Sequence, residues 1–467
     1  MKIEQIYTGC LAQGAYYITS GDEAVIIDPL REIKPYLERA KKDGVTIKYV
    51  FETHFHADFV SGHIDLAKAT GATIIYGPTA TPSFEAHIAT DQEIFNLGNV
   101  SFKVLHTPGH TIESTCYLLR DENKNDVAIF TGDTLFIGDV GRPDLAQKAV
   151  DLTQEALAAL LYNSLRTKVM TLDDHIIVYP AHGAGSACGK KMSKETTSTI
   201  GVQKQLNYAL RSDMTEAEFI AEVTDGLLPP PAYFPMNVGM NKHGYDSIDS
   251  VMQRGLTALS PTAFQKAADT TGALLLDTRN PEVFALGFIP NSINIGLNGQ
   301  FAPWVGALIP DIKQEILLIT EVGNEEETVT RLARVGYDCV IGFLEGGFEA
   351  WEASNHEIDS VNRITADEFA AMHPQNPIVI DVRKPSEYDT EHVAGAISIP
   401  LDFINDDLAQ FPKNEPFVIH CAGGYRSMMA ASILKARGWD NFSEVAGGFA
   451  AIKNTGVPYN DFVNTAG

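Results

Sequence analysis

Histidine and aspartate side chains gather in four short segments of the chain, and each segment follows a stretch with the composition of a β-strand. These segments read H-F-H-A-D at 54–58, H-T-P-G-H at 106–110, T-G-D at 131–133 and Y-P-A-H-G at 179–183. Loops at strand ends hold side chains in fixed positions, and neutral imidazoles and carboxylates are good ligands for zinc, iron or manganese. A lone histidine is more often structural than a ligand, but four such segments together predict a metal site.

A cysteine near the C-terminal end lies in a second chemically suggestive segment, H-C-A-G-G-Y-R-S at 420–427, which an apolar helical pattern follows. Its glycines allow successive backbone N–H groups to point inward, and the start of a helix adds positive potential. Both features stabilise a thiolate and the anionic persulfide that it can form. We therefore predict that Cys421 is a catalytic nucleophile and that Arg426 completes the ring of positive charge around it. The other residues predicted for this persulfide-binding loop are Ala422, Gly423, Gly424, Tyr425 and Ser427.

The elements that must position these residues differ between the two ends of the chain. In the first region, the runs at 24–27, 73–76 and 127–130 have the composition of buried strands, and apolar residues alternate with polar ones at 100–104. Alternation of this kind is typical of a strand with one wet face. Helical patterns lie between several of the runs. The mixture predicts layered sheets flanked by helices.

The C-terminal part of the chain contains an internal repeat. The segment 274–279 is echoed by 378–383, and 344–348 is echoed by 445–449, with two further matches in the same order between them. Four ordered matches indicate two copies of one α/β domain of about 100 residues each, which is a usual domain size. The predicted domains are 1–254, 255–360 and 361–467.

The first of the two copies lacks the thiol. Its loop at 320–327 reads T-E-V-G-N-E-E-E, so that Glu321 takes the place of the cysteine and Glu326 that of the arginine. A carboxylate cannot carry sulfane sulfur, and three consecutive glutamates repel an anion. We expect this middle domain to be catalytically inactive and to space or dock the other two.

Composition narrows the class of protein. The chain has 467 residues, 45% of them hydrophobic and 20% charged, with a formal net charge of −25. This size predicts two to four domains, and a diffuse acidic balance argues against binding of nucleic acid or of anionic membranes.

Five scattered cysteines do not form a disulfide framework. The N-terminus has no apolar signal segment, and no apolar run has the length of a membrane span. We expect a cytoplasmic protein.

The histidine and aspartate segments, H-x-H-x-D, P-G-H, T-G-D and a late A-H, resemble the metallo-β-lactamase superfamily over roughly residues 1–250. The resemblance implies an αββα sandwich and is strongest to the glyoxalase II and persulfide dioxygenase branches. In the two-metal hydrolases of the superfamily a histidine follows the H-x-H-x-D aspartate and binds the second metal. Here Phe59 stands at that position, which argues against a dinuclear zinc centre.

The motifs T-H-x-H-A-D and G-R-x-D are similar to those of persulfide dioxygenases. Carried over, this resemblance implies a single Fe(II) per chain held by His54, His110 and Asp133, a facial triad that leaves positions for O₂ and a substrate sulfur. The residues implied to surround the triad, where they orient ligands and shuttle protons, are His56, Asp58 and His182.

Three further residues near this site have two interpretations each. Arg142 either clamps a carboxylate of a thiol substrate or pairs with Asp144. Cys188, in a segment of small residues, is either a thiol site or incidental. Tyr233 belongs either to an aromatic flap over the site or, with Phe234, to the core.

The loop C-x-x-G-x-R, together with D-V-R at 381–383 and G-A at 395–396, resembles the rhodanese sulfurtransferases. The fold class expected is therefore α/β, with an N-terminal αββα sandwich followed by two rhodanese-like α/β domains with parallel sheets. The whole sequence resembles bacterial fusions of a persulfide dioxygenase, an inactive rhodanese and an active rhodanese.

The resemblance implies that a low-molecular-weight thiol persulfide and O₂ yield sulfite at the iron. The Cys421 domain would then pass sulfane sulfur to sulfite, giving thiosulfate, in detoxification of sulfide or persulfide. We expect a homo-oligomer with no nucleic-acid or membrane partner.

Two alternatives remain open. One is a zinc-dependent thioester hydrolase of the glyoxalase II type with an accessory sulfurtransferase domain. The other is a non-catalytic sulfur sensor or carrier.

Overall fold

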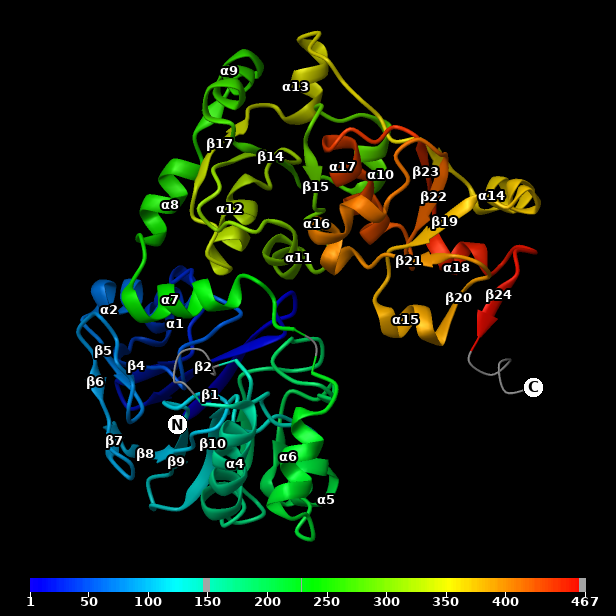
Figure 1. Cartoon of the computed structure of the whole chain (residues 1–467). Coiled ribbons are helices and arrows are strands. Elements are labelled where there is room, and N and C mark those ends of the chain that lie inside the picture. Colours follow the sequence, from blue (N-terminus) through cyan, green and yellow to red (C-terminus); the bar gives the residue numbers. More distant parts are fainter. Residues whose placement is uncertain (146–151, 228, 462–467) are drawn as a thin grey trace. The chain divides into compact units, whose positions relative to one another are not determined.

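The computed structural model describes residues 1–145, 152–227 and 229–461 (Figure 1). The chain divides into two compact units, Met1–Ile248 together with Ala333–Gly336, and Asp249–Leu332 together with Tyr337–Gly467. The second unit contains both copies of the internal repeat, apart from Ala333–Gly336 of the middle copy. The domain limit predicted at 254/255 falls at the end of helix α8 (Ile248–Gly255), and residues 462–467 of the last domain lie outside the described residues. The limits of the three domains stay predictions.

Two six-stranded sheets form the first unit. The first sheet has the order β1-β2-β3-β4-β5-β6, and the second has the order β12-β11-β10-β9-β8-β7. The strands of the first sheet are β1 (Lys2–Thr8), β2 (Gln13–Ser20), β3 (Glu23–Ile27), β4 (Thr46–Phe51), β5 (Thr73–Tyr76) and β6 (His87–Ile88). Those of the second are β7 (Ile94–Leu97), β8 (Val100–His106), β9 (Thr115–Arg120), β10 (Asp126–Gly132), β11 (Ile177–Pro180) and β12 (Ser198–Thr199).

The two sheets pack face to face through an aromatic core. The Phe51 ring of the first sheet stacks on Tyr117 of the second with their centroids 4.5 Å apart, and Phe102 meets Phe51 edge-on at 5.3 Å. In β8 the residues Val100, Phe102 and Val104 are buried while those between them are half-buried. The predicted alternation is therefore the inward face of this strand.

Helices cover the outer face of each sheet. Side chains of α1 and α2 join the core on the outer side of the first sheet. Helices α4 and α6 lie beside the second sheet (Figure 1), and their side chains join the core on its outer side. The unit is thus an αββα sandwich, as predicted. The α-helices of this unit within the described residues are α1 (Lys34–Asp43), α2 (His63–Thr70), α4 (Gln154–Ser164), α5 (Ile200–Leu206), α6 (Glu216–Thr224) and α7 (Phe234–His243).

Each repeat of the second unit builds a five-stranded sheet, and the two sheets have the same topology. The orders are β13-β17-β16-β14-β15 and β18-β23-β22-β19-β21, and the pairs within both sheets are parallel. The strands of the middle repeat are β13 (Ala258–Leu259), β14 (Leu274–Asp277), β15 (Ile293–Asn294), β16 (Ile316–Ile319) and β17 (Val340–Leu344). Those of the last repeat are β18 (Arg363–Ile364), β19 (Ile378–Asp381), β21 (Ile397–Ser398), β22 (Phe417–His420) and β23 (Phe442–Val445). The predicted fold class is confirmed.

Helices alternate with the strands in both repeats, as parallel pairing requires. Those of the middle repeat are α9 (Pro261–Thr271), α10 (Pro281–Leu286), α11 (Phe301–Leu308), α12 (Glu325–Arg334) and α13 (Gly347–Ala353). Those of the last repeat are α14 (Ala366–Met372), α15 (Pro385–Thr390), α16 (Ile404–Asp407), α17 (Tyr425–Ala436) and α18 (Gly448–Ile452). A small two-stranded sheet of β20 (Glu391–Val393) and β24 (Tyr459–Asp461) belongs to the last repeat.

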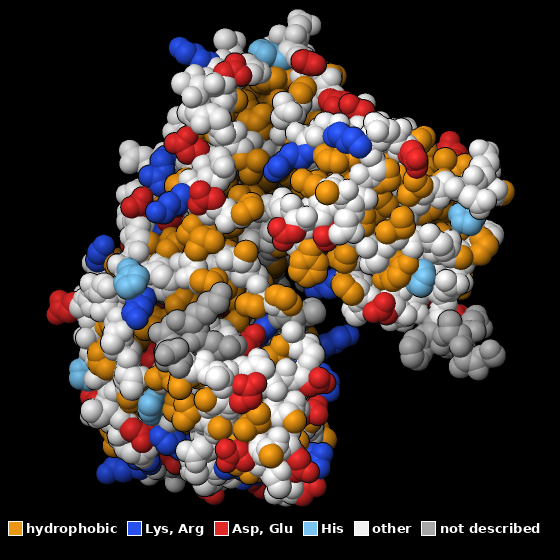
Figure 2. Space-filling model, in the orientation of Figure 1, with side chains coloured by type: hydrophobic (Ala, Val, Ile, Leu, Met, Phe, Trp, Pro, Cys, Tyr) orange, Lys and Arg blue, Asp and Glu red, His pale blue; other side chains and the backbone are white. Residues whose placement is uncertain are grey.

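The distribution of charge on the surface agrees with the diffuse acidic balance of the composition. On the face that Figure 2 shows, acidic side chains are dispersed among basic ones. Across the described part of the chain, each helix is too short or too polar to cross a bilayer.

Candidate metal centre and thiol loop

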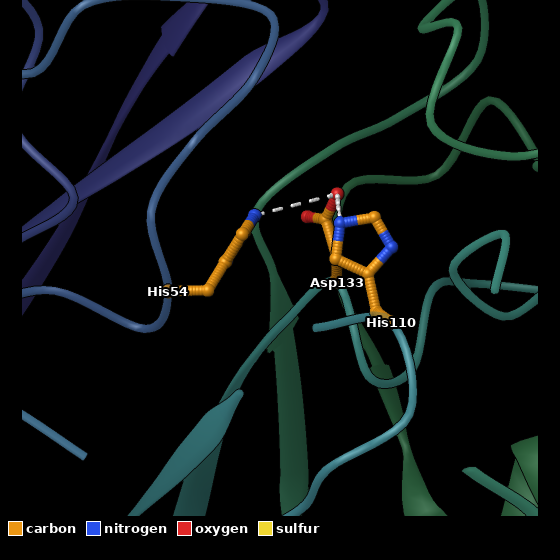
Figure 3. A group of neighbouring side chains, drawn as sticks. All are labelled: His54, His110 and Asp133. Atoms are coloured by element: carbon orange, nitrogen blue, oxygen red, sulfur yellow. Dashed lines mark ion pairs between the residues drawn. The ribbon is translucent and has the colours of Figure 1, made fainter. Parts of the chain in front are cut away.

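His54, His110 and Asp133 come together in the first unit, although they stand far apart in the sequence. Each follows the end of a strand, β4, β8 and β10 respectively. The Nε2 atom of His110 lies 3.4 Å from Asp133 Oδ2 and that of His54 lies 3.9 Å from it (Figure 3). All three side chains are buried. The group is arranged so that both imidazoles and the carboxylate converge on one point.

The Asp133 carboxylate favours a candidate metal site over a structural cluster. Neither of its oxygens accepts a hydrogen bond from any described residue. A buried carboxylate without hydrogen bonds is costly unless a cation compensates it. One carboxylate and two imidazole Nε2 atoms are a donor set that suits iron or zinc, so the residues present fit a divalent metal.

The two imidazoles are oriented by their other ring nitrogens. His54 Nδ1 lies 3.0 Å from Thr53 Oγ1, and His110 Nδ1 lies 2.9 Å from the carbonyl oxygen of Arg142. These contacts leave both Nε2 atoms facing Asp133. Burial, assisted by the neighbouring imidazoles, holds the pKa of His54 well below its usual range. His54 is therefore neutral, as a metal ligand must be.

A second group lies beside the first and consists of the residues predicted to surround the triad, His56, Asp58 and His182. His182 Nε2 is 3.4 Å from Asp58 Oδ2 and 3.6 Å from Asp133 Oδ1. Burial, assisted by the charge of Asp133, raises the pKa of Asp58 above its usual range. The Asp58–His182 pair can thus hold a proton next to the triad.

His56 has partners that the sequence pattern did not reveal. Its Nε2 atom is 3.1 Å from Asp28 Oδ1 and 3.6 Å from Glu52 Oε2. Burial opposes its charge, but Asp28, followed by Glu52, raises the pKa of His56 to about 9. His56 is therefore a cation that pairs with the Asp28 carboxylate, while burial holds the pKa of Glu52 well above its usual range. The available signal was that Asp28 and Glu52 each directly follow an apolar strand.

Phe59 contributes packing and no ligand. Its side chain is fully buried, and its ring lies 4.3 Å from that of His56 with an interplanar angle of 31°. The amide of Asn241 donates to the backbone carbonyl oxygens of both residues. The position that would carry a further imidazole is thus filled by an apolar ring.

The two polar residues with alternative interpretations have structural partners. Arg142 forms a bidentate pair with Asp144, with both N–O distances 2.6 Å. Cys188 is buried, and its sulfur forms a compact group with Asp133 and His182. Burial, together with the charges of Asp58 and Asp133, raises the pKa of the Cys188 thiol well above its usual range.

Tyr233 is buried just before helix α7. Its ring meets that of Phe234 edge-on at a centroid distance of 5.1 Å, and only 3% of the residue is exposed. This position favours the core interpretation of Tyr233.

The second reactive segment lies in the last repeat, where Cys421 directly follows β22 and the loop leads into α17. Cys421 is 1% exposed. The backbone N–H of Gly424 donates to the Cys421 sulfur at 3.1 Å, and Gly424 has a φ of +102°, which favours glycine. The predicted inward N–H group is observed at this residue. Ala422 and Gly423 complete the turn, and the carbonyl oxygen of Ala422 accepts from the Ala450 N–H at 3.0 Å.

Two side chains of the loop have partners outside it. Arg426 forms a bidentate pair with Glu387 on α15, at 2.5 and 2.8 Å, so its charge is shared with a carboxylate that the sequence analysis missed. The Tyr425 hydroxyl donates to the carbonyl oxygen of Gly296 in the middle repeat at 2.7 Å. Tyr425 thus links the loop to the neighbouring repeat.

The αββα sandwich with a buried His-His-Asp group defines a metal-binding α/β protein with two appended sulfurtransferase-like folds. Comparison with known families agrees, because the metallo-beta-lactamase superfamily profile matches residues 8–182. The rhodanese-like domain profile matches twice, at residues 260–354 and 365–455. The chain belongs to the metallo-β-lactamase superfamily and carries two rhodanese-like domains.

Individual relatives share parts of this architecture. The hydroxyacylglutathione hydrolase of Tolumonas auensis is 30% identical over 235 residues, which cover 44% of this chain and 85% of that protein. The crystal structure of a metallo-β-lactamase from Staphylococcus aureus subsp. aureus COL has a TM-score of 0.65 and 32% identity, and covers 74% of this chain and 98% of its own. The crystal structure of ETHE1 from Myxococcus xanthus has a TM-score of 0.44 and 28% identity, and covers 52% and 98%.

Proposed function

We propose that the first unit is an iron-dependent persulfide dioxygenase and that the Cys421 domain is a sulfurtransferase acting on the same sulfur. One Fe(II) per chain is held by His54, His110 and Asp133. A low-molecular-weight thiol persulfide, RSSH, reacts with O₂ and water to give RSH, sulfite and two protons. The observation that carries the proposal is the convergent His-His-Asp group, in which the carboxylate has no hydrogen bond from a described residue.

Bound Fe(II) would supply the redox chemistry by which dioxygen oxidises the sulfane sulfur. The residues of the chain orient the ligands and accept protons. Thr53 and the carbonyl of Arg142 fix the two imidazole ligands. The Asp58–His182 pair lies 3.6 Å from Asp133 Oδ1 and can accept a proton released in the reaction.

The thiol loop uses the same sulfur species. Cys421 accepts the outer sulfur of a persulfide, whose S–S bond breaks while a new S–S bond forms on Cys421. Sulfite then takes this sulfur from Cys421 and becomes thiosulfate. The N–H of Gly424 stabilises the anionic sulfur throughout. The product of the first unit is thus the acceptor of the second reaction, and together the two remove persulfide.

A second candidate function is a zinc-dependent thioester hydrolase. It is favoured by the relatedness to a hydroxyacylglutathione hydrolase at 30% identity. Such a reaction uses a hydroxide generated by the metal and needs no O₂. Phe59 argues against a two-zinc version, because an apolar ring fills the position of the additional ligand.

Metal content and oxygen uptake distinguish the two candidates. We expect about one iron per chain in protein purified without oxygen, and O₂ uptake with a panel of thiol persulfides. Asp133→Ala should lose metal affinity by at least roughly a hundredfold, since removal of even a supporting partner costs 10–100-fold, and should abolish O₂ uptake. Two zinc ions per chain with rapid thioester hydrolysis would instead establish the second candidate.

The matched control is Asp126→Asn. Asp126 lies at the other end of the same strand, β10, and pairs with Arg120 at the surface. This variant should keep iron and O₂ uptake.

A further inference from the structure

The Cys421 sulfur is the first member of a series of polar contacts inside the last repeat that the proposed function does not use. The Ser427 hydroxyl oxygen lies 3.4 Å from Cys421 Sγ and 2.6 Å from Glu444 Oε1. The other oxygen of Glu444 accepts from Arg363 Nε at 2.8 Å. Ser427 and Glu444 are both fully buried. A carboxylate is thus connected to the reactive sulfur through one hydroxyl group.

A serine hydroxyl carries a single proton, so it can donate to one neighbour at a time. When Glu444 is ionised, Ser427 donates to it and presents a lone pair to the sulfur, which then carries its own hydrogen. When Glu444 is protonated, it donates to Ser427, whose hydrogen becomes available to the Cys421 thiolate. The geometry therefore places one proton either on the sulfur or on Glu444.

The middle repeat provides an internal comparison for this chain of contacts. Its strand pairing β13–β17 places Ala258 opposite Phe343, where β18–β23 places Arg363 opposite Glu444. The inactive copy has also replaced the cysteine and the serine. The middle repeat carries Glu321, Glu327, Phe343 and Ala258 at the positions of Cys421, Ser427, Glu444 and Arg363, respectively.

The scaffold around these positions has not changed in the same way. The pair Asp277–Arg279 has the same bidentate contacts as Asp381–Arg383, and a Gly-Gly pair follows β17 in the middle copy and β23 in the last copy. The middle repeat, which lacks the thiol, thus also lacks the counterparts of Ser427, Glu444 and Arg363. This coincidence links the three residues to the chemistry of Cys421 rather than to the fold.

We propose that Ser427 and Glu444 form a proton relay for the Cys421 thiol. The S–H bond of Cys421 breaks and its proton passes to Ser427 Oγ, while the proton of Ser427 passes to Glu444 Oε1. Net charge is unchanged, and no electrons are transferred to or from another reactant. Ser427 contacts the reacting sulfur and is a catalytic residue. Glu444 and Arg363 act through it and are positioning residues. The inference deepens, and rests on, the proposed sulfurtransferase role of Cys421.

The surroundings of Glu444 suit a proton acceptor. Arg363 on β18 contacts one carboxylate oxygen of Glu444, and Ser427 connects the other oxygen to Cys421. The exposed Glu282 lies on the other side of Arg363, with its carboxylate 3.5 Å from the guanidinium. Burial raises the pKa of Glu444, although Ser427 and Arg363 partly oppose this effect. A carboxylate that accepts a proton readily next to a thiol favours the thiolate.

The test is the alkylation rate of Cys421 by iodoacetamide, followed by mass spectrometry of its peptide so that the other four cysteines do not interfere. In Glu444→Gln the rate near pH 7 should fall at least roughly tenfold, because glutamine cannot accept the proton and acid–base assistance is typically worth more than that. Near pH 10 the two rates should converge. An unchanged rate overturns the relay. A faster rate also overturns it, because it would show that the carboxylate only repels the thiolate.

Two serine variants keep the test informative if Glu444→Gln folds poorly. Ser427→Ala removes the bridge and should slow alkylation in the same way, whereas Ser427→Thr keeps a hydroxyl and should restore the rate. If alanine and threonine behave alike, the relay is wrong.

Ser443→Ala is the matched control, since Ser443 precedes Glu444 on β23 and its hydroxyl contacts Asn362 instead. It should alkylate like the unmodified chain. Alkylation requires neither metal nor persulfide, so the result is independent of the proposed oxidation.

Discussion

The middle and last repeats carry their loops at the same place, after β16 and after β22, yet the two loops present different groups. In the last repeat Cys421 is buried and the Gly424 N–H donates to its sulfur at 3.1 Å. In the middle repeat Glu321 is exposed, and the Gly323 N–H donates to the side chain of Glu325 at 2.9 Å. The counterpart of Gly424 in the middle loop is Asn324, whose backbone N–H donates to the carbonyl oxygen of Glu321 at 3.0 Å. A carboxylate of the middle loop thus takes up the N–H group one position earlier. The two repeats share a scaffold and differ at the few residues to which we assign the chemistry.

The largest expected effect separates the thiol loop from the metal centre. Cys421→Ser should keep iron, O₂ uptake and sulfite release but abolish thiosulfate formation, since serine cannot hold a persulfide. Product analysis by thiol derivatisation under limiting persulfide measures both anions. Sulfite should accumulate. Thiosulfate formed at the unmodified rate would place sulfur transfer elsewhere, and Cys188 would be the next residue to replace.

The second prediction tests whether the two scaffolds are equivalent. Arg279→Met and Arg383→Met each leave a buried aspartate without its partner, which costs roughly 3–5 kcal/mol. Hydrogen exchange resolves the repeats separately. We expect each variant to lower protection in its own sheet by a similar amount. A large loss in one repeat alone would mean that the shared motif has different roles in the two copies.

The comparison also shows how far the sequence determines the site. A metal site was predictable because the histidine and aspartate segments each follow a strand, whereas the choice of His54, His110 and Asp133 came from the resemblance to persulfide dioxygenases. The partners Glu387 of Arg426 and Asp28 of His56 were not, since side chains 39 and 28 positions apart meet only through packing. Hydrophobic periodicity specifies which face is buried and not which polar groups meet on it.

Glu444 is an instructive intermediate case. A glutamate in a short buried strand departs from the apolar pattern, and the internal repeat places Phe343 at the same position. Alignment of the two copies could therefore have marked it as functional. The contact with Ser427 required the structure, because it depends on the packing of α17 against β23.

The third prediction attempts to restore activity to the middle loop. In a Cys421→Ser background, Glu321→Cys combined with Glu326→Arg supplies the missing thiol and guanidinium. We expect thiosulfate formation below roughly a hundredth of the unmodified rate, because Glu325 still occupies the Gly323 N–H and acid–base assistance is absent. The assay is the same product analysis. A rate near that of the unmodified chain would show that the thiol and the arginine suffice.

The smallest expected effect concerns the middle loop as it stands. Glu321→Ala should leave O₂ uptake and thiosulfate formation within about twofold of the unmodified chain, since an exposed carboxylate in this loop carries no sulfur. The neighbouring exposed Val322 gives the matched control Val322→Ala, which alters the same loop without changing its charge. A loss of more than tenfold in Glu321→Ala alone, about 1.4 kcal/mol of transition-state stabilisation, would contradict the inactive assignment. The carboxylate would then have to act on the reaction itself. Measuring both products in one assay decides which reaction it serves, because O₂ uptake reports on the first unit and thiosulfate on Cys421.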